Sequence, residues 1–252
     1  MPAMDYDRVA ELYDAYVQGD FDLDFFKREA GRTSGEVLEL MSGTGRVSVP
    51  LIESGARLTC VDASRSMLDR LEEKLKRKGL RARVVQADVC ELALDAFYDL
   101  IFIPFHSFAE ITDEIQQRRA LGRIYKHLTD QGRFICTLHN PAVRLKESNG
   151  QKKLLGRFPL TPGDDTLALW SQEQYDRDKR IVNGKQFYEI YDSSDRLRES
   201  SYLDIAFYAH DRASFESLAG DAGFRVVDLY GSYDRSAFDE TISPVMIWVL
   251  VK

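Results

Sequence analysis

Cysteine is scarce in this sequence of 252 residues, which contains only three. Cys60, Cys90 and Cys136 lie far apart in apolar stretches and have no CxxC spacing. An odd number of isolated cysteines is typical of reduced, buried thiols that pack as small hydrophobic side chains. We therefore predict no metal site and expect a cytoplasmic protein.

Long hydrophobic runs and an excess of positive charge are also missing. No apolar run approaches the ~18 residues of a membrane-spanning helix. The acidic N-terminus, MPAMDYDRVAELYDAY, lacks the basic region and apolar core of a secretory signal. The formal net charge is −7 and the pI about 5.3, whereas phosphate binding needs a basic face. We therefore expect neither a membrane nor a nucleic acid as partner.

The chain does contain a strand, a glycine-rich turn and a helical pattern in direct succession. Residues 36–46, EVLELMSGTGR, begin with a short apolar run and continue into the small residues of the loop at 42–45. Glycines let the backbone turn tightly and approach a ligand closely. This order is typical of a nucleotide-type binding site, although one Gly-x-Gly alone is weak support.

Apolar runs alternate with amphipathic segments along most of the chain. We expect strands at residues 36–40, 57–61, 83–86, 98–104, 133–138, 224–230 and 245–251. We expect helices at residues 45–54, 64–78, 113–129 and 211–222. Pro50 conflicts with the first helix, so a kink or a delayed start is expected there. Strands that alternate with helices indicate an α/β fold with a mostly parallel, doubly wound sheet.

Residues 165–210 have a different pattern, with many β-forming residues in rough alternation. We predict an antiparallel meander of three or more strands, with turns at Asn183-Gly184 and at residues 192–195. The expected domains are 1–150 with 211–252, which includes an N-terminal arm at 1–32, and an inserted β subdomain at 151–210. In the arm, Tyr13 and Tyr16 share a helical face that either docks on the domain or closes as a lid.

Three acidic residues stand at or near the ends of successive predicted strands: Glu39, Asp62 and Asp88. Ligands of open parallel sheets lie beyond the carboxyl ends of the strands. Asp62 suits ribose hydroxyls and Asp88 an adenine amino group. Glu39 would repel a pyrophosphate beside the glycine loop but attract an ammonium group, which favours a cationic nucleoside with an amino-acid tail over a dinucleotide.

Four motifs occur in the order of a known family. ELMSGTGR, CVDASRSML, QADV and YDLIFIPF resemble motifs I to IV of class I S-adenosylmethionine-dependent methyltransferases. The resemblance implies a Rossmann-like sheet of seven strands whose last strand is antiparallel. The arm and the insertion resemble those of small-molecule members such as sugar N-methyltransferases and glycine N-methyltransferase, in which the insertion covers the acceptor site and often supports a homodimer. Met41 departs from the family, which commonly has glycine there.

The resemblance implies S-adenosyl-L-methionine as cofactor, S-adenosyl-L-homocysteine as product and a small organic molecule as acceptor. The cofactor-binding residues that it implies are Tyr6, Tyr13, Glu39, Met41, Ser42, Gly43, Thr44, Gly45, Asp62, Ala63, Met67, Ala87, Asp88, Val89, Pro104, Phe105 and Phe108. Simpler roles exist for some of them, because Met67 can be helix packing and Asp62 a helix cap.

Methyl transfer is an in-line displacement, for which the protein mainly supplies position and a dry cleft. A general base is needed only if the acceptor arrives protonated. His106 is the best candidate base by residue type, with an orienting role as the alternative. His139 follows the next strand on the same sheet edge and can contact the acceptor, and Tyr13 can close over the site.

Other functions compete with methyl transfer. Gly43, Gly45 and Ser48 loosely match the GxGxxG of nicotinamide-dependent oxidoreductases, but Ser48 replaces the third glycine. A nucleic-acid or protein methyltransferase is a third interpretation, although the sequence has no N/D-P-P-Y/F after the fourth predicted strand and no basic stripe. A cofactor-binding module without catalysis is a fourth.

Overall fold

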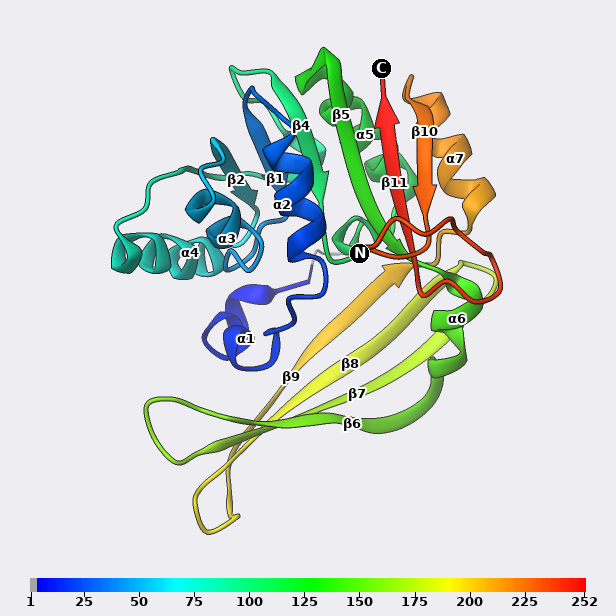
Figure 1. Ribbon diagram of the computed structural model, residues 1–252. Coiled ribbons are helices and arrows are strands. Elements are labelled where there is room, and N and C mark those ends of the chain that lie inside the picture. The colour runs from blue at the N-terminus through cyan, green and yellow to red at the C-terminus, as the bar shows by residue number, and fades with distance from the viewer. Residues whose placement is uncertain (1–3) are drawn as a thin grey trace.

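The computed structural model of the chain describes residues 4–252 and contains two β-sheets (Figure 1). The larger has seven strands in the order β10-β11-β5-β4-β1-β2-β3. Their bounds are β1 Val37–Leu40, β2 Leu58–Asp62, β3 Arg83–Gln86, β4 Tyr98–Ile103, β5 Leu128–His139, β10 Arg225–Tyr230 and β11 Val245–Val251. β1 to β5 run parallel, and β11 is antiparallel to both neighbours. The predicted seven-stranded, doubly wound sheet is confirmed.

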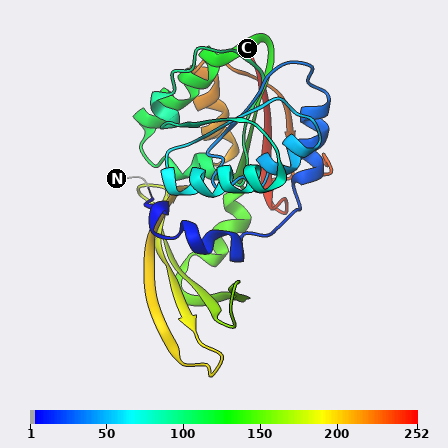
Figure 2. The ribbon, with the colours of Figure 1, turned by 90° about the vertical axis from the view of Figure 1, so that its left-hand side faces the viewer.

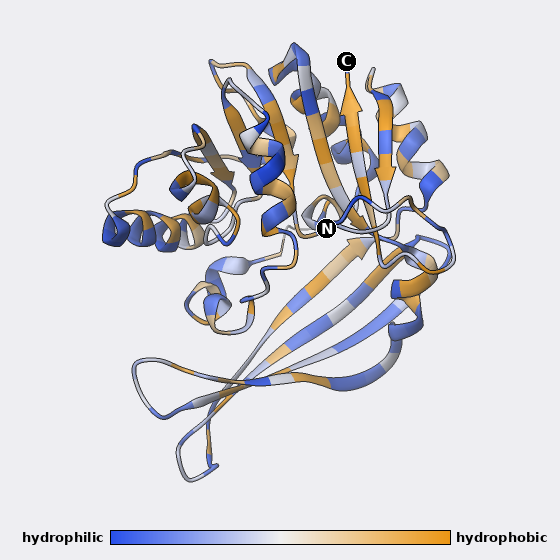
Figure 3. Cartoon of the chain, in the orientation of Figure 1, coloured by the Kyte–Doolittle hydropathy of each residue, from blue (hydrophilic) through white to orange (hydrophobic). Residues whose placement is uncertain are grey.

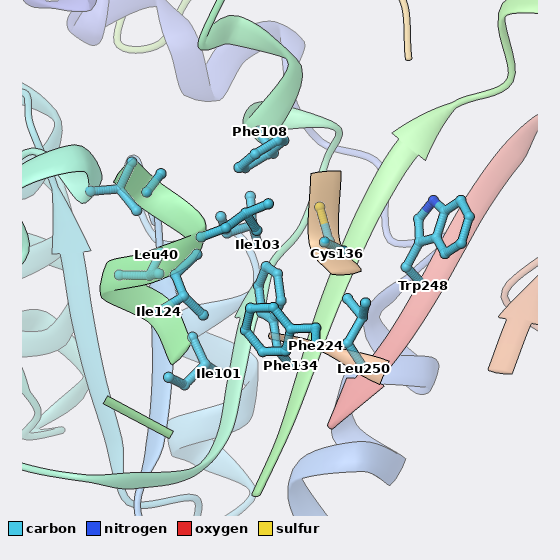
Figure 4. Packing of buried hydrophobic residues seen from close by; sticks show 14 of the residues in the cluster. Leu40, Ile101, Ile103, Phe108, Ile124, Phe134, Cys136, Phe224, Trp248 and Leu250 are labelled. Carbon is cyan, nitrogen blue, oxygen red and sulfur yellow. The ribbon is translucent and has the colours of Figure 1, made fainter. Parts of the chain in front are cut away.

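Helices cover both faces of this sheet, which explains why its central strands are continuously apolar. One face carries α2 Leu23–Gly31, α3 Ser48–Glu53 and α4 Arg65–Lys78, and the other carries α5 Glu114–His127 and α7 Arg212–Asp221. Figure 4 shows the second core, where Trp248 of β11 and Phe134 of β5 are fully buried. In Figure 3 the strands of this sheet are largely hydrophobic. Cys60, Cys90 and Cys136 are buried free thiols, as predicted.

Local signals in the sequence set most of the helix ends. α3 starts only at Ser48 and keeps Pro50 in its first turn, so the delayed start is confirmed. The side chains of Ser64 and Asp211 accept hydrogen bonds from the first turns of α4 and α7. The prediction for the fifth strand was wrong at its start, because β5 begins at Leu128 and continues through Gly132.

The second sheet is an antiparallel meander of four strands, β6 Asn149–Pro159, β7 Thr166–Asp176, β8 Ile181–Tyr191 and β9 Leu197–Tyr208. The predicted turn at residues 192–195 is confirmed, with Asp195 at φ 57°. The turn predicted at Asn183-Gly184 is wrong, because both residues lie inside β8. The backbones of β7 and β8 approach closely at Gly184 and leave no room for a side chain, because a Cβ would stand 2.3 Å from the carbonyl oxygen of Gln172 on β7.

The N-terminal arm lies between the two sheets, below α4 in Figure 2. It consists of the 3₁₀ turn η1 Tyr6–Arg8 and the helix α1 Ala10–Tyr16. Val9 is buried against the inner face of the small sheet, beside Leu169 and Tyr188. The arm is thus docked in this structure, and its role as a lid stays a prediction. In residues 4–252, no helix combines the length and the apolar character needed to cross a membrane.

Short helical elements complete the chain, and several carry residues of the site described below. They are η2 Val89–Glu91, η3 Ser107–Glu110, α6 Pro141–Arg144 and η4 Leu145–Glu147. η2 follows β3, η3 follows β4 and α6 follows β5, so each begins at the carboxyl end of a parallel strand. These connections therefore place their side chains at the sheet edge where ligands of such folds bind.

Candidate active site

A cavity of about 360 Å³ opens at the carboxyl ends of β1, β2 and β3. We call it cavity 1. Ten of the sequence-predicted cofactor residues line it: Tyr6, Tyr13, Met41, Gly43, Asp62, Ala63, Met67, Ala87, Asp88 and Val89. They come from the arm, the glycine loop and the ends of three strands. The fold thus brings together residues that are far apart in the sequence.

The glycine loop after β1 holds a strained backbone. Met41 has φ 57° and Gly43 φ 55°, so a methionine occupies the left-handed conformation that glycine favours. Gly45, at φ 83°, leaves no room for a side chain, because a Cβ would stand 2.3 Å from Leu71 Cδ1 of α4. The loop therefore has the tight path that the motif predicts, even though Met41 replaces the usual glycine.

Two carboxylates at strand ends face cavity 1, and both are fixed by backbone amides. The Gly43 amide donates to Asp62 Oδ2 at 2.7 Å, and the Ser64 amide donates to Asp62 Oδ1 at 2.9 Å. The pKa of Asp62 is raised because burial outweighs these bonds. Asp88, at the end of β3, accepts from the Cys90 amide at 2.8 Å. Each carboxylate keeps free lone pairs, so the pair can accept hydrogen bonds from a polar ligand.

A second cavity, of about 430 Å³, lies between the edge of the large sheet and the small sheet. We call it cavity 2. Within residues 4–252, four residues line both cavities: Met4, Tyr6, Tyr13 and Glu110. Aromatic rings make up much of the wall of cavity 2, namely Tyr6, Tyr13, Tyr16, Phe21, Phe105, Phe158 and Phe207. The two cavities therefore meet beneath the arm.

The three residues predicted to act in catalysis, His106, His139 and Tyr13, all line cavity 2. The rings of His106 and His139 stack at a centroid distance of 3.6 Å. Burial lowers the pKa of His106 to about 3 and that of His139 well below its ordinary value. Both imidazoles are neutral at physiological pH, so His106 is a weaker base here than its residue type suggests. Burial also raises the pKa of Tyr13, which keeps its hydroxyl protonated.

Backbone strain also marks the start of η3. Phe105 and His106 have φ of 56° and 64°, and the His106 amide donates to Thr137 Oγ1 at 3.1 Å. Consecutive left-handed residues that are neither glycine nor asparagine are costly and cluster at functional sites. The turn directs both side chains into cavity 2, where Phe105 stacks on Phe21 of the arm.

Several predicted cofactor residues do not line cavity 1. Phe105 lines cavity 2, and the remaining six are Glu39, Ser42, Thr44, Gly45, Pro104 and Phe108. Glu39 is 1% exposed and accepts from Ser48 Oγ at 2.5 Å, and burial raises its pKa to about 8. Thr44 donates to Asp14 of the arm at 2.6 Å. Phe108 packs in the core against Phe215. Their roles stay predictions.

Sequence reasoning missed Glu110, Arg144 and Glu173, which line cavity 2. Arg144 Nη2 lies 2.5 Å from Glu173 Oε2, so α6 is tied to β7. Glu110 ends η3, one turn beyond the strand-end positions that were considered. Asp62 and Asp88 were found by a search for acidic residues at the carboxyl ends of parallel strands. The same search finds Glu110 if it includes the first helical turn after each strand. Glu173 carries no such signal, because its place depends on how the two sheets pack.

A buried ion pair that the sequence did not indicate helps to anchor the arm. Both guanidinium nitrogens of Arg46 donate to the fully buried Asp22, at 2.5 and 2.7 Å. Arg46 also stacks over Phe105, 4.9 Å from the ring centre. The glycine loop, the arm and the η3 turn therefore form one connected structure around the two cavities.

Comparison with known proteins agrees with this geometry. Residues 37–132 match the model of a methyltransferase domain family. The chain is 30% identical over 203 residues to the cypemycin N-terminal methyltransferase of a Streptomyces species, which covers 81% of this chain and 76% of that protein. The chain belongs to the class I S-adenosylmethionine-dependent methyltransferases.

Solved structures of other methyltransferases share the whole fold. A S-adenosylmethionine-dependent methyltransferase of Clostridium acetobutylicum has a TM-score of 0.80 at 17% identity, over 98% of both chains. A sugar N-methyltransferase of a Streptoalloteichus species has a TM-score of 0.73 at 18% identity, over 100% of this methyltransferase and 95% of that chain. Both matches extend over the arm and the four-stranded sheet, so these parts belong to the shared architecture.

Proposed function

We propose that this methyltransferase binds S-adenosylmethionine in cavity 1 and a small organic acceptor in cavity 2. The observation that carries the proposal is that the two cavities meet at Met4, Tyr6, Tyr13 and Glu110. An in-line displacement needs donor and acceptor to approach through such a shared boundary. The inserted sheet, predicted at residues 151–210, supplies the far wall of cavity 2 and so covers the acceptor site.

The side chains of cavity 1 fit the nucleoside part of the cofactor. Asp62 offers carboxylate oxygens to ribose hydroxyls, and Asp88 offers them to the adenine edge. Met67 is 2% exposed and Val89 5% exposed, and both present apolar surface to the cavity. Glu39 and Arg46 stand near the glycine loop, where the amino-acid tail belongs. When bound, the cofactor supplies a sulfonium-activated methyl group.

The protein itself contributes position and the exclusion of water. The arm covers both cavities through Tyr6 and Tyr13, and the small sheet encloses cavity 2. The neutral pair of His106 and His139 suits hydrogen bonding to the acceptor, because a neutral imidazole has one ring nitrogen that donates and one that accepts. A dry, oriented site is what methyl transfer requires of the protein.

The names of the similar proteins support a small acceptor that carries nitrogen. One acts on the N-terminus of cypemycin and another is a sugar N-methyltransferase. A nicotinamide-dependent oxidoreductase is disfavoured, because the Gly43 amide of the glycine loop already donates to the carboxyl group of Asp62, where a pyrophosphate would need that amide. The homodimer through the four-stranded sheet stays a prediction.

The Asp62→Asn variant tests the cofactor site. The substitution replaces one carboxylate oxygen of Asp62 with a side-chain NH₂ group. This NH₂ group then faces the backbone N–H of Gly43 or Ser64 and cannot accept its hydrogen bond, so residue 62 has one acceptor oxygen fewer. Hydrogen bonds to charged groups contribute about 1.5–3 kcal/mol, so affinity for S-adenosylhomocysteine should fall about 10- to 100-fold in calorimetry.

The matched control is Asp69→Asn, which makes the same change on the exposed face of α4. Its affinity for S-adenosylhomocysteine should equal that of the wild type, and the melting temperature of both variants shows whether they fold. Unchanged affinity in a folded Asp62→Asn variant would contradict the proposed cofactor site.

A further inference from the structure

The charges that line cavity 2 are balanced except at one position. Arg144 and Glu173 neutralise each other in their ion pair. The lowered pKa values of His106 and His139 leave both rings uncharged. Glu110 has no cationic partner among the described residues. Cavity 2 therefore presents one carboxyl group that no positive charge of residues 4–252 compensates.

The surroundings of Glu110 are suited to a positive charge. Tyr6, Tyr13 and Phe105 present aromatic surface to the same cavity, and ring faces attract cations. The Tyr6 hydroxyl donates to Glu110 Oε1 at 3.1 Å, which fixes the carboxyl group and leaves its second oxygen free. The arm and the η3 turn thus hold this group at the boundary of the two cavities.

The protonation of Glu110 depends on its environment. Burial is the main reason that its pKa is raised to about 8, and the nearby Asp62 raises it further, while the Tyr6 hydrogen bond lowers it. The other titratable groups that line cavity 2 are Tyr6, Tyr13, Tyr16, His106, His139, Arg144 and Glu173. A carboxyl group with a pKa near neutrality can both bind a cation and accept a proton.

We propose that the acceptor is a cationic amine and that Glu110 binds its ammonium group and takes its proton before methyl transfer. This inference rests on the proposed function, since it names the acceptor class of the same site. It also assigns the proton transfer to Glu110, with His106 and His139 left to orient the nitrogen.

The proposed step balances in protons and electrons. The ammonium N–H bond breaks, its electron pair stays on nitrogen as a lone pair, and the proton passes to the Glu110 carboxylate. That lone pair forms the new N–CH₃ bond, while the S–CH₃ bond breaks and its electron pair remains on sulfur. The products are an N-methylammonium ion and a neutral thioether, and the Glu110 proton is released to solvent.

A different cation competes for Glu110. The carboxyl group also borders cavity 1, so it can instead serve the sulfonium of the methyl donor. The two roles differ in their effect on binding, because S-adenosylmethionine is a sulfonium cation there and S-adenosylhomocysteine is neutral. Under our proposal, loss of Glu110 should leave the affinity for both compounds unchanged. Under the alternative, it should weaken the binding of S-adenosylmethionine selectively.

The test is calorimetry near neutral pH on the enzyme saturated with S-adenosylhomocysteine. The probes are three amines and their neutral counterparts: phenethylamine and 2-phenylethanol, D-glucosamine and D-glucose, and alanylalanine amide and its N-acetyl derivative. At least one amine should bind about tenfold more tightly than its counterpart, as a charge-assisted hydrogen bond allows. Amine binding should release protons, because a bound cation lowers the pKa of Glu110.

The Glu110→Gln variant should lose this preference for the amine and the proton release while it keeps its affinity for S-adenosylhomocysteine. Glu114→Gln is the matched control, since Glu114 is exposed at the start of α5 and lines neither cavity. It should behave as the wild type does. Melting temperatures of both variants verify that they fold.

The possible failures are distinct. If the wild type does not bind S-adenosylhomocysteine, the proposed function fails. If it binds S-adenosylhomocysteine but prefers no amine, only the inference about the acceptor is overturned. If a folded Glu110→Gln variant keeps the amine preference, or loses S-adenosylmethionine selectively, Glu110 is not the group that binds the acceptor.

Discussion

Met41 shows at the scale of one residue how a motif tolerates an exception. The family commonly has glycine at this position, yet Met41 adopts the same left-handed conformation, φ 57°. Its side chain packs against the core beneath the sheet, which offsets part of the backbone strain. The conformation of the backbone at position 41 is therefore kept, although the residue type there differs from the usual glycine.

A pair of variants separates the strain from the packing. Met41→Gly and Met41→Ala both remove the side chain, but only glycine relieves the left-handed backbone. Met41→Gly should be more stable than Met41→Ala by about 1 kcal/mol in urea unfolding. Equal stability, or a more stable alanine variant, would show that residue 41 does not adopt the left-handed conformation in solution.

The sequence predicted individual site residues when a strand end fixed their place. Asp62 ends β2 and Asp88 stands two residues after β3, and both face cavity 1. The prediction for His106 was right about its location but not about its basicity. Its pKa is low because the side chain is buried and lies near Arg144. Burial of this kind depends on segments about 40 to 100 residues away in the chain, which no local pattern reports.

At the scale of elements, the N-terminal arm connects the two cavities to the rest of the fold. Its contacts with the large domain are mostly polar: Asp7 accepts from Ser64, Asp14 accepts from Thr44 and Lys74, and Asp22 pairs with Arg46. Polar contacts of this type open more readily than an apolar core. Because Tyr6 and Tyr13 line both cavities, these contacts border the candidate site.

Asp14 is the contact that holds α1 to the glycine loop and α4. Asp14→Ala removes hydrogen bonds from Thr44 and Lys74 of 2.6 Å each. We expect amide hydrogen exchange in residues 9–16 to become roughly tenfold faster, since Asp14 is partly exposed and such contacts are modest. Glu11→Ala is the control, because Glu11 is 88% exposed and should leave exchange unchanged. Equal exchange in both variants would show that Asp14 does not anchor the arm.

Element boundaries were predictable where capping residues mark them and less so within the small sheet. Ser64, Gly79 and Asp211 mark helix ends that the structure confirms. Asn183-Gly184 is a strong turn signal, yet both residues pair within β8. There the glycine serves a close approach of two backbones, and a sequence cannot distinguish that use from a turn.

At the scale of the whole molecule, the two cavities take their walls from two separate sheets and from the arm, which lies beside both sheets (Figure 1). The large sheet provides cavity 1 from its strand ends, and the small sheet closes cavity 2. The alternation of strands and helices was enough to predict the large sheet, and the β-forming residues at 165–210 predicted an antiparallel meander. The way they pack was not predictable, because it depends on side chains such as Val9 and Tyr188 that meet only in the folded chain.

The central claim is that cavity 1 takes S-adenosylmethionine. The most direct measurement is a calorimetric titration of the wild-type protein with S-adenosylmethionine, S-adenosylhomocysteine and NAD. We expect the first two to bind at one site per chain, at least about 100-fold more tightly than NAD, a difference of about 3 kcal/mol. Binding of NAD without binding of either adenosyl compound would contradict the account.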